Sequence, residues 1–288
     1  MSHPVSSAAL RRVGIVGVGL IGGSLAIGLR RSAPGAVIVG CDNSTVLRRA
    51  RRLRLIDDTV SRVEGLLDTC GVIVLCAPLD ANCKVLRKLR STRNERRGVI
   101  VDFSSLQAPP VAAWKTAPRR NEWEFVSCHP MAGSEASGPE SANADVFPGA
   151  TLYVDANARL SGEGKLTLAK LAKHLGMRTA RVSNEDHDRA MAYVSHLPQL
   201  VAVALAQALA PKSASHLKLA GGGVRGMTRL AGSSAALWEP LVRANQGATL
   251  DAMNQFTAAW LHLVETVSSQ RTLTGAFRSA RKVYTCLL

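Results

Sequence analysis

The first residues whose spacing suggests chemistry form the run GVGLIG at 17–22, directly after the apolar stretch 13–16. Gly17 can make a tight turn out of a strand, and Gly19 leaves room for a pyrophosphate to approach the backbone. Gly22 allows the following helix to pack closely on that strand. The N–H groups at the start of such a helix favour a bound phosphate. The order of strand, glycine turn and helix therefore predicts a dinucleotide-binding site.

An acidic residue supports this prediction and bears on which dinucleotide is bound. A second apolar stretch, 36–40, is followed by Asp42, about 25 residues after the first glycine. An Asp there can accept hydrogen bonds from ribose hydroxyls and would repel a 2′-phosphate. The sequence therefore predicts NAD rather than NADP. Arg48 and Arg49 are the residues that would favour NADP, because their charges could bind its 2′-phosphate. The predicted cofactor-binding residues are Gly17, Gly19, Leu20, Ile21, Gly22, Asp42, Ala77 and Pro78.

Three more segments combine polar and strained residues in ways that suggest a reaction site. VDFSS at 101–105 and SCHPMAGSE at 127–135 each end a predicted strand. Ligands of open α/β sheets bind at the carboxyl ends of strands, so both segments lie where chemistry is expected. The third segment, SHLPQ at 195–199, places Pro198 inside a predicted helix, where proline costs roughly 3 kcal/mol.

Short apolar strands and helical stretches must hold these segments in place. We expect strands at 13–16, 36–40, 72–77, 98–102, 125–128, 151–154 and 178–182. Helices are expected at 25–29, 44–54, 80–91 and 161–175. This alternation predicts an α/β Rossmann-type domain with a doubly wound parallel sheet over residues 1–183.

The sequence changes character at residue 184. Asn184 is a plausible N-cap, since acidic residues follow it in the first turn. Helix-forming residues then run to 210, and a second long helical region covers 234–270. We expect an all-α domain over 184–288. Its helices carry more apolar surface than one chain would cover, which predicts a homodimer through this domain.

Composition limits the class of protein. The chain has 288 residues, 47% of them hydrophobic, and a net charge of +15. The run Arg48–Arg54 fits the solvated face of a helix, and no aromatic residues are interleaved for base stacking, so nucleic-acid binding is not expected. No apolar run approaches the ~20 residues of a membrane span, and no secretory leader is recognised, which predicts a cytoplasmic protein. The six cysteines show no metal-ligand spacing and are expected to be buried free thiols, with no bound metal.

Four motifs in one order resemble the prephenate/arogenate dehydrogenase family of tyrosine biosynthesis. They are GVGLIGGS, HPMAGSE, SHLP, and TRLA followed by Trp238. The resemblance covers residues 12–270 and implies a Rossmann domain followed by a helical dimerisation domain. It also implies NAD-dependent oxidative decarboxylation of an anionic cyclohexadiene to an aromatic product. Hydride would leave the carbon that bears the ring hydroxyl.

The resemblance also assigns roles to residues. His129 would accept the hydrogen bond or proton of the ring hydroxyl, and Ser105 would orient His129 or the hydroxyl. Arg229 would hold a substrate carboxylate with its planar fork of donors. The remaining substrate-binding residues expected from the motifs are Glu135, His187, His196, Gln199 and Trp238, of which Trp238 could equally be helix core.

Three departures from the family pattern bear on the substrate. Gln107 stands where the family often has Lys, and Gln199 where many prephenate-using members have His. Gly226 replaces a usual Asp. Fewer cations would favour a substrate with an ammonium group, because like charges repel. The pattern therefore favours arogenate, or another amino-bearing analogue such as 4-amino-4-deoxyprephenate, over prephenate.

Two other functions fit parts of the sequence. A β-hydroxyacid-type dehydrogenase also joins a Rossmann domain to a helical domain, but no suitable catalytic Lys lies near residues 185–200. A catalytically inactive nucleotide-binding protein would explain the three departures, whereas the presence of His129, Ser105 and Arg229 together argues against it.

Overall fold

A computed structural model describes residues 9–133, 136–210 and 214–287. The chain divides into two compact units. The first comprises Met1–Met191 and Ser233–Ala244, and the second comprises Ala192–Gly232 and Asn245–Leu288. The predicted boundary at residues 183/184 stays a prediction.

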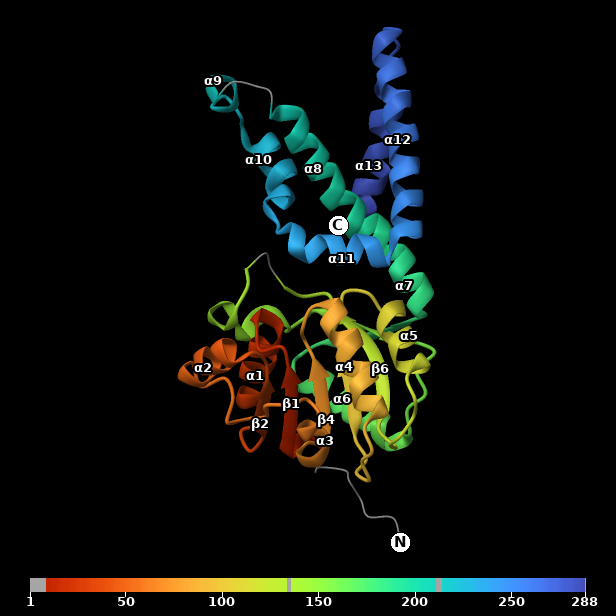
Figure 1. Cartoon of the computed structure of the whole chain (residues 1–288). Coiled ribbons are helices and arrows are strands. Elements are labelled where there is room, and N and C mark those ends of the chain that lie inside the picture. Colours follow the sequence, from red (N-terminus) through yellow and green to blue (C-terminus); the bar gives the residue numbers. More distant parts are fainter. Residues whose placement is uncertain (1–8, 134–135, 211–213, 288) are drawn as a thin grey trace. The chain divides into compact units, whose positions relative to one another are not determined.

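The first unit is built on one eight-stranded sheet (Figure 1). Its strands, in sheet order, are β3 (Asp58–Thr59), β2 (Val37–Cys41), β1 (Arg12–Val16), β4 (Val72–Leu75), β5 (Val99–Asp102), β6 (Glu124–Pro130), β7 (Thr151–Asp155) and β8 (Arg178–Val182). The order 3-2-1-4-5-6 is that of a dinucleotide-binding fold. The Rossmann-type prediction is therefore confirmed.

One strand departs from the expected parallel sheet. The pairs from β3 to β6 are parallel, but β7 runs antiparallel to β6, with His129 opposite Tyr153. The last strand, β8, is again parallel to β7. Residues 151–154 and 178–182 extend the sheet as predicted, and the reversal at β7 could not be foreseen because periodicity carries no strand direction.

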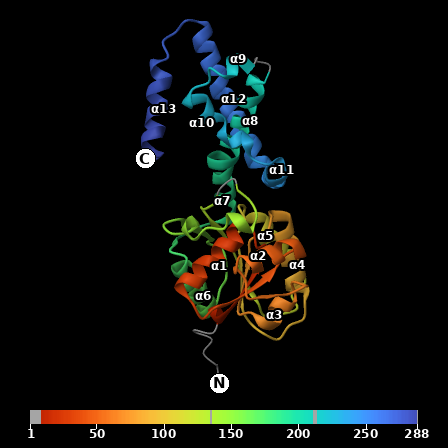
Figure 2. The ribbon, with the colours of Figure 1, turned by 90° about the vertical axis from the view of Figure 1, so that its left-hand side faces the viewer.

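Helices cover both faces of this sheet. Those of the first unit are α1 (Leu20–Ser32), α2 (Ser44–Arg52), α3 (Gly65–Thr69), α4 (Leu79–Ser91), α5 (Ala108–Thr116), α6 (Gly162–His174), α7 (Asn184–Met191) and α11 (Ala235–Ala244). Figure 2 shows α1 and α6 on one side of the sheet and α3 and α4 on the other. One core cluster contains Ile15, Leu25 and Leu171, and a second contains Ile73, Leu66 and Leu86. Burial on both faces explains why the central strands are continuously apolar.

Several local predictions need correction. The N-cap of α7 is Ser183, whose Oγ accepts from the Asp186 N–H at 3.1 Å, and Asn184 is already inside the helix. The helix α2 ends at Arg52, two residues before the predicted end, and Arg54 has a φ of 56°. Helices α3 and α5 and strand β3 were not predicted.

The cysteines are free as expected, but not all are buried. Cys70, Cys83 and Cys128 are buried, Cys41 and Cys76 are half-buried, and Cys286 is exposed. Burial raises the pKa of the Cys41 thiol to about 11.

The second unit is helical. It contains η4 (Ala192–His196), α8 (Leu197–Leu209), α9 (Ala214–Leu217), α10 (Gly222–Thr228), η5 (Arg229–Gly232), α12 (Gln246–Ser268) and α13 (Thr274–Leu287). The predicted helical region 234–270 is divided at Asn245, so that α11 packs with the sheet unit and α12 with the helical unit.

The helix accommodates Pro198 by a change of hydrogen-bond pattern one turn before it. Residues 192–196 form a π-helical turn, η4, directly before the helix that contains Pro198 in its first turn. Proline cannot donate to the preceding turn, and a π-turn shifts the hydrogen-bond pattern around that missing donor.

By length and composition alone, the helical run Asn184–Leu209 could cross a membrane, with a mean hydropathy of 1.3 over its best window. The sequence prediction did not anticipate this.

Candidate active site

The glycine turn has the geometry that its sequence predicted. Gly17 has a φ of 85°, and a side chain on it would collide with the backbone of Ala77. A side chain on Gly22 would collide with the Gly17 carbonyl, so α1 packs directly on the turn. A Cβ on Gly19 would meet no heavy atom within 4 Å. Two glycines thus serve close packing, and the third borders open space at the helix start.

Asp42 lies beside this turn. Its Oδ2 accepts a hydrogen bond from the Val18 N–H at 2.8 Å, and its Oδ1 accepts from the Asn43 N–H at 2.7 Å. The side chain is half-buried. Arg49, which could have met a 2′-phosphate, is hydrogen-bonded instead to Glu140. Two backbone N–H groups therefore fix the Asp42 carboxylate beside the glycine turn.

A buried polar network joins the strand ends below the predicted cofactor site. Asn82 on α4 accepts from the Ala77 N–H at 3.2 Å and donates to Asp102 Oδ1 and to Ser104 Oγ, each at 3.0 Å. Ser104 and Ser127 donate to Asp102 at 2.7 Å and 3.1 Å. Complete burial nevertheless raises the pKa of Asp102 to about 7, against the lowering effect of these donors. The network fixes Ala77, which faces Gly17.

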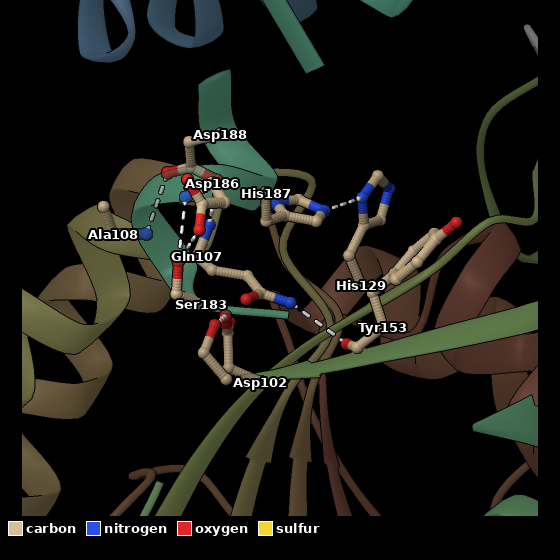
Figure 3. A network of polar contacts seen from close by, with 10 residues as sticks. Asp102, Gln107, Ala108, His129, Tyr153, Ser183, Asp186, His187 and Asp188 are labelled. Atoms are coloured by element: carbon tan, nitrogen blue, oxygen red, sulfur yellow. Dashed lines mark hydrogen bonds and ion pairs between the residues drawn. The ribbon is translucent and has the colours of Figure 1, made fainter. Parts of the chain in front are cut away.

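His129 belongs to a second network at the same edge of the sheet (Figure 3). Its Nδ1 lies 3.0 Å from His187 Nε2, and the two rings meet edge to face. His187 Nδ1 lies 2.7 Å from Asp188 Oδ1. His187 and Asp188 are buried, whereas His129 is half-buried. A half-buried imidazole with one nitrogen fixed from behind can exchange a proton through the other.

The backbone explains why Asp188 lies there. Its Oδ1 accepts from the Gln107 N–H and its Oδ2 accepts from the Ala108 N–H, both at 2.8 Å. Pro109 and Pro110 follow, so the next two helical positions of α5 have no N–H to satisfy. Asp188 thus caps α5 from a distant part of the chain and ties α7 to the end of β5.

Gln107 is completely buried beneath this network. Its Nε2 donates to the Tyr153 carbonyl at 3.0 Å, and its Oε1 has no hydrogen-bond partner among the described residues. Because a carbonyl can only accept, this bond fixes which end of the amide is nitrogen.

The other predicted residues of this unit are placed differently. Ser105 is exposed after β5 and forms no hydrogen bond with a described residue, so His187 rather than Ser105 holds the His129 ring. Trp238 is half-buried and packs on a small apolar cluster that includes Leu79, Met191 and Leu241. Glu135 lies outside the described residues.

Three predicted residues lie in the helical unit. His196 is buried and its Nδ1 lies 3.1 Å from Thr249 Oγ1 on α12. Gln199 is buried; its Nε2 donates to the Leu230 carbonyl at 2.8 Å, and its Oε1 is without a partner in the described part of the unit. This bond holds the η5 turn, where the neighbouring Arg229 is exposed.

Sequence reasoning missed Asn82 and Asp188. Both are polar residues on amphipathic helices, where a solvated position is the usual expectation, and only the fold turns them toward strand ends. The acidic residues on both sides of His187, Asp186 and Asp188, were a usable signal, since a carboxylate next to a histidine can orient its ring. Within the described ranges, no group of three His, Cys, Asp or Glu side chains is arranged to hold a metal ion.

Comparison with known proteins agrees with this architecture. Residues 25–183 match the family model "Prephenate dehydrogenase, nucleotide-binding domain", and residues 183–276 match "Prephenate dehydrogenase, dimerization domain". Among curated proteins, prephenate dehydrogenase of Bacillus subtilis is 28% identical over 247 residues, or 84% of this chain and 66% of the relative. The chain therefore spans about two thirds of that protein. Cyclohexadienyl dehydrogenase of Zymomonas mobilis is 25% identical over 90% of this chain and 89% of its own.

Solved structures show the same similarity. Prephenate dehydrogenase from Aquifex aeolicus, in complex with hydroxyphenyl propionate and NAD+, has a TM-score of 0.86 and 26% identity, covering 98% of this chain and 100% of that one. Arogenate dehydrogenase of Synechocystis has a TM-score of 0.73 and 27% identity, covering 95% and 99%. With the two family models together spanning residues 25–276, the chain belongs to the prephenate dehydrogenase family.

Proposed function

We propose that this chain catalyses the NAD-dependent oxidative decarboxylation of a cyclohexadienyl substrate to an aromatic product. The observation that carries the proposal is His129, held by His187 at the end of β6 in a chain of this family. The β-hydroxyacid alternative is disfavoured, because both units match prephenate dehydrogenase models instead.

The residues around the glycine turn fit NAD. The open space at Gly19 suits a pyrophosphate, and the α1 N-terminus has no side-chain cap that would compete with it. The Asp42 carboxylate suits ribose hydroxyls, and the pairing of Arg49 with Glu140 leaves this arginine engaged elsewhere. NAD is therefore favoured over NADP. When bound, it supplies the acceptor for a hydride.

The proposed reaction breaks two bonds of the substrate ring. A hydride leaves the hydroxyl-bearing ring carbon, and the bond from the ring to its carboxylate breaks to release carbon dioxide. The electron pair of that bond stays in the ring, which becomes aromatic. His129 accepts the hydroxyl proton or its hydrogen bond while charge shifts on the oxygen, and the proton ends on the phenol. The protein mainly aligns the donor carbon and polarises the hydroxyl.

Other residues would bind the substrate. We assign the exposed guanidinium of Arg229 to a carboxylate, which its planar fork can bind in two places. Ser105, exposed and without a hydrogen bond to His129, would contact the ring hydroxyl directly. Glu135, His196, Gln199 and Trp238 remain proposed pocket residues.

We also propose that the substrate carries an amino group. Gln107 and Gln199 stand where relatives of this family often carry cations, and the Oε1 atom of each is buried without a partner among the described residues. An amide oxygen accepts from an ammonium group, whereas Lys or a charged His would repel it. Arogenate, with a zwitterionic side chain, is thus preferred over prephenate.

The first experiment compares prephenate and arogenate, each with NAD and with NADP, by following the reduced cofactor at about 340 nm. We expect the highest kcat/KM with arogenate and NAD. Gln199→His should move the ratio toward prephenate, and His129→Asn should lower kcat by about 10²- to 10⁴-fold while nucleotide binding is retained. A clear preference of the unmodified chain for prephenate would contradict the amino-group proposal.

A negative result has a defined next step. If neither substrate reacts, 4-amino-4-deoxyprephenate is assayed in the same way, since His129 could face a ring amine as well as a hydroxyl. If NAD binds but none of the three substrates reacts, the chain is a nucleotide-binding protein without this activity, and the proposed function is wrong.

We propose a homodimer formed through the helical unit. The match to a dimerisation domain supports this, together with large apolar side chains exposed on α12, among them Trp260, Leu261 and Val267.

The free cysteines of the described chain are consistent with the cytoplasmic location that the sequence predicts.

A further inference from the structure

We infer that Asp188 and His187 hold His129 in one tautomer, with the proton on Nδ1 and the lone pair on Nε2. His187 is then a positioning residue rather than a substrate-binding residue. The catalytic half of this inference rests on the proposed function, since Nε2 is the nitrogen that would meet the substrate hydroxyl.

The argument starts from groups whose hydrogen-bonding roles are fixed. The N–H groups of Gln107 and Ala108 can only donate, and they point at the two carboxyl oxygens of Asp188 at 2.8 Å each. Both oxygens therefore act as acceptors, as expected of an ionised carboxylate at a helix N-terminus.

The polarity of His187 follows from Asp188. Its Nδ1 lies 2.7 Å from Asp188 Oδ1, so Nδ1 carries a proton and donates it. In the neutral imidazole, the other nitrogen, Nε2, then has a lone pair.

The polarity of His129 follows in turn. Its Nδ1 lies 3.0 Å from His187 Nε2, and a hydrogen bond between them requires His129 Nδ1 to donate. The lone pair of neutral His129 is thus on Nε2. Figure 3 shows this second nitrogen on the side of the ring away from His187. An imidazole in this tautomer can take a proton from a substrate hydroxyl without first rearranging.

The arrangement depends on the charge of His187. A doubly protonated His187 would donate from Nε2 to His129 Nδ1, which would leave the His129 proton on Nε2 and remove the base. The other ionisable side chains nearby are Asp188 on α7, Tyr153 on β7, whose ring lies 5.9 Å from that of His187, and Asp102 at the end of β5. The arrangement therefore holds only while His187 Nε2 keeps its lone pair.

The tautomer can be read directly by nitrogen NMR. The chain has seven histidines, and labelling their rings with ¹⁵N separates protonated from bare ring nitrogens. The His129 signals are assigned by their loss in His129→Asn. In the full chain at about pH 8, where an ordinary histidine is neutral, we expect a protonated Nδ1 and a bare Nε2 at His129. A protonated Nε2 would overturn the inference, and this measurement needs no substrate and no variant of His187.

Two substitutions test the role of His187. His187→Leu removes the acceptor, so His129 should show mixed tautomers and kcat should fall about 10- to 100-fold, with KM for NAD unchanged. In His187→Gln, one amide can donate to Asp188 and accept from His129, so the single tautomer should return and kcat should recover to within about tenfold of the original. His174→Leu on α6, outside this network, is the matched control.

The outcomes separate the two proposals. A single Nδ1–H tautomer in a chain that oxidises no cyclohexadienyl substrate would overturn the proposed function but not the tautomer. Full activity and a single His129 tautomer, with the proton on Nδ1, in a folded His187→Leu would overturn the positioning role, whatever the substrate.

Discussion

Asp102 shows at the scale of one residue how burial and hydrogen bonding oppose each other. Three side chains donate to its carboxyl group, which favours the charged form. The group is nevertheless completely buried, and loss of hydration raises its pKa to about 7. The carboxyl links Asn82 on α4 to Ser127 on β6, so its protonation state bears on the strand ends that carry the site.

This pKa predicts a pH dependence of stability. Between about pH 4 and pH 7 the folded protein keeps a proton on Asp102 that the unfolded chain has released, so stability falls as pH rises, by at most about 1.4 kcal/mol per pH unit. Asp102→Asn cannot titrate. In urea unfolding, the free energy of this variant minus that of the original chain should therefore become more positive from pH 4.5 to 7.5.

The control for this experiment is Asp80→Asn, which changes an exposed carboxylate in the first turn of α4. Its stability should follow that of the original chain at every pH. If the free energy of unfolding of Asp102→Asn also ran parallel to that of the original chain between pH 4.5 and 7.5, the prediction would be wrong, because Asp102 would then have its ordinary pKa in the folded protein.

At the scale of elements, α5 depends on a cap supplied from elsewhere in the chain. Its own sequence begins with Ala-Pro-Pro and has no capping side chain. Asp188 on α7 accepts from the Gln107 and Ala108 N–H groups instead. The same carboxylate orients His187, so helix capping and alignment of the site share one residue.

Loss of this cap should destabilise the sheet unit. Asp188→Ala removes the acceptor for two backbone N–H groups, one buried and one part-buried, and we expect a loss of about 1–2 kcal/mol in the free energy of unfolding, measured in urea. The matched control is Glu185→Ala, an exposed residue of the same charge in the first turn of the same helix. It should change the free energy by less than about 0.5 kcal/mol. If both substitutions lowered the free energy of unfolding equally, Asp188 would act only through its charge and not as a cap of α5.

At the scale of the whole molecule, the helical unit does not bury its apolar surface within one chain. In α12 only Thr249 and Ala252 are buried, while several large side chains of the same helix are exposed. Exposed apolar area of this extent marks an interaction surface. A second copy of the chain is the occupant that the family's dimerisation domain suggests.

A charge placed on this surface should weaken the dimer. Trp260 is 57% exposed in the single chain, and large aromatic residues often dominate interfaces. Light scattering should give twice the chain mass of 30.6 kDa for the original protein. We expect Trp260→Arg to raise the dissociation constant at least tenfold, whereas Asn254→Glu, at an exposed polar position of α12, should not. A monomeric original protein would contradict the proposal.

Local pattern predicted much of this molecule. The strand at 178–182 has the predicted bounds, and α4 and α6 begin and end within one residue of their predicted limits. Their apolar periodicity is local and strong. The five-residue α3 and two-residue β3 were missed because segments that short carry too little pattern, and α5 was missed because its cap lies about 80 residues away.

The sequence by itself determined the nucleotide fold and its glycine turn, since a φ of 85° at Gly17 and the close packing at Gly22 are demands that only glycine meets. It also singled out His129 through the HPMAGSE motif, while the family resemblance added His187 as an expected substrate-binding residue. Only the tertiary structure decided that these rings face each other, that Asp188 stands behind them, and that β7 runs antiparallel to β6. Such contacts join residues far apart in sequence, and the choice among them depends on how the elements pack rather than on any local preference.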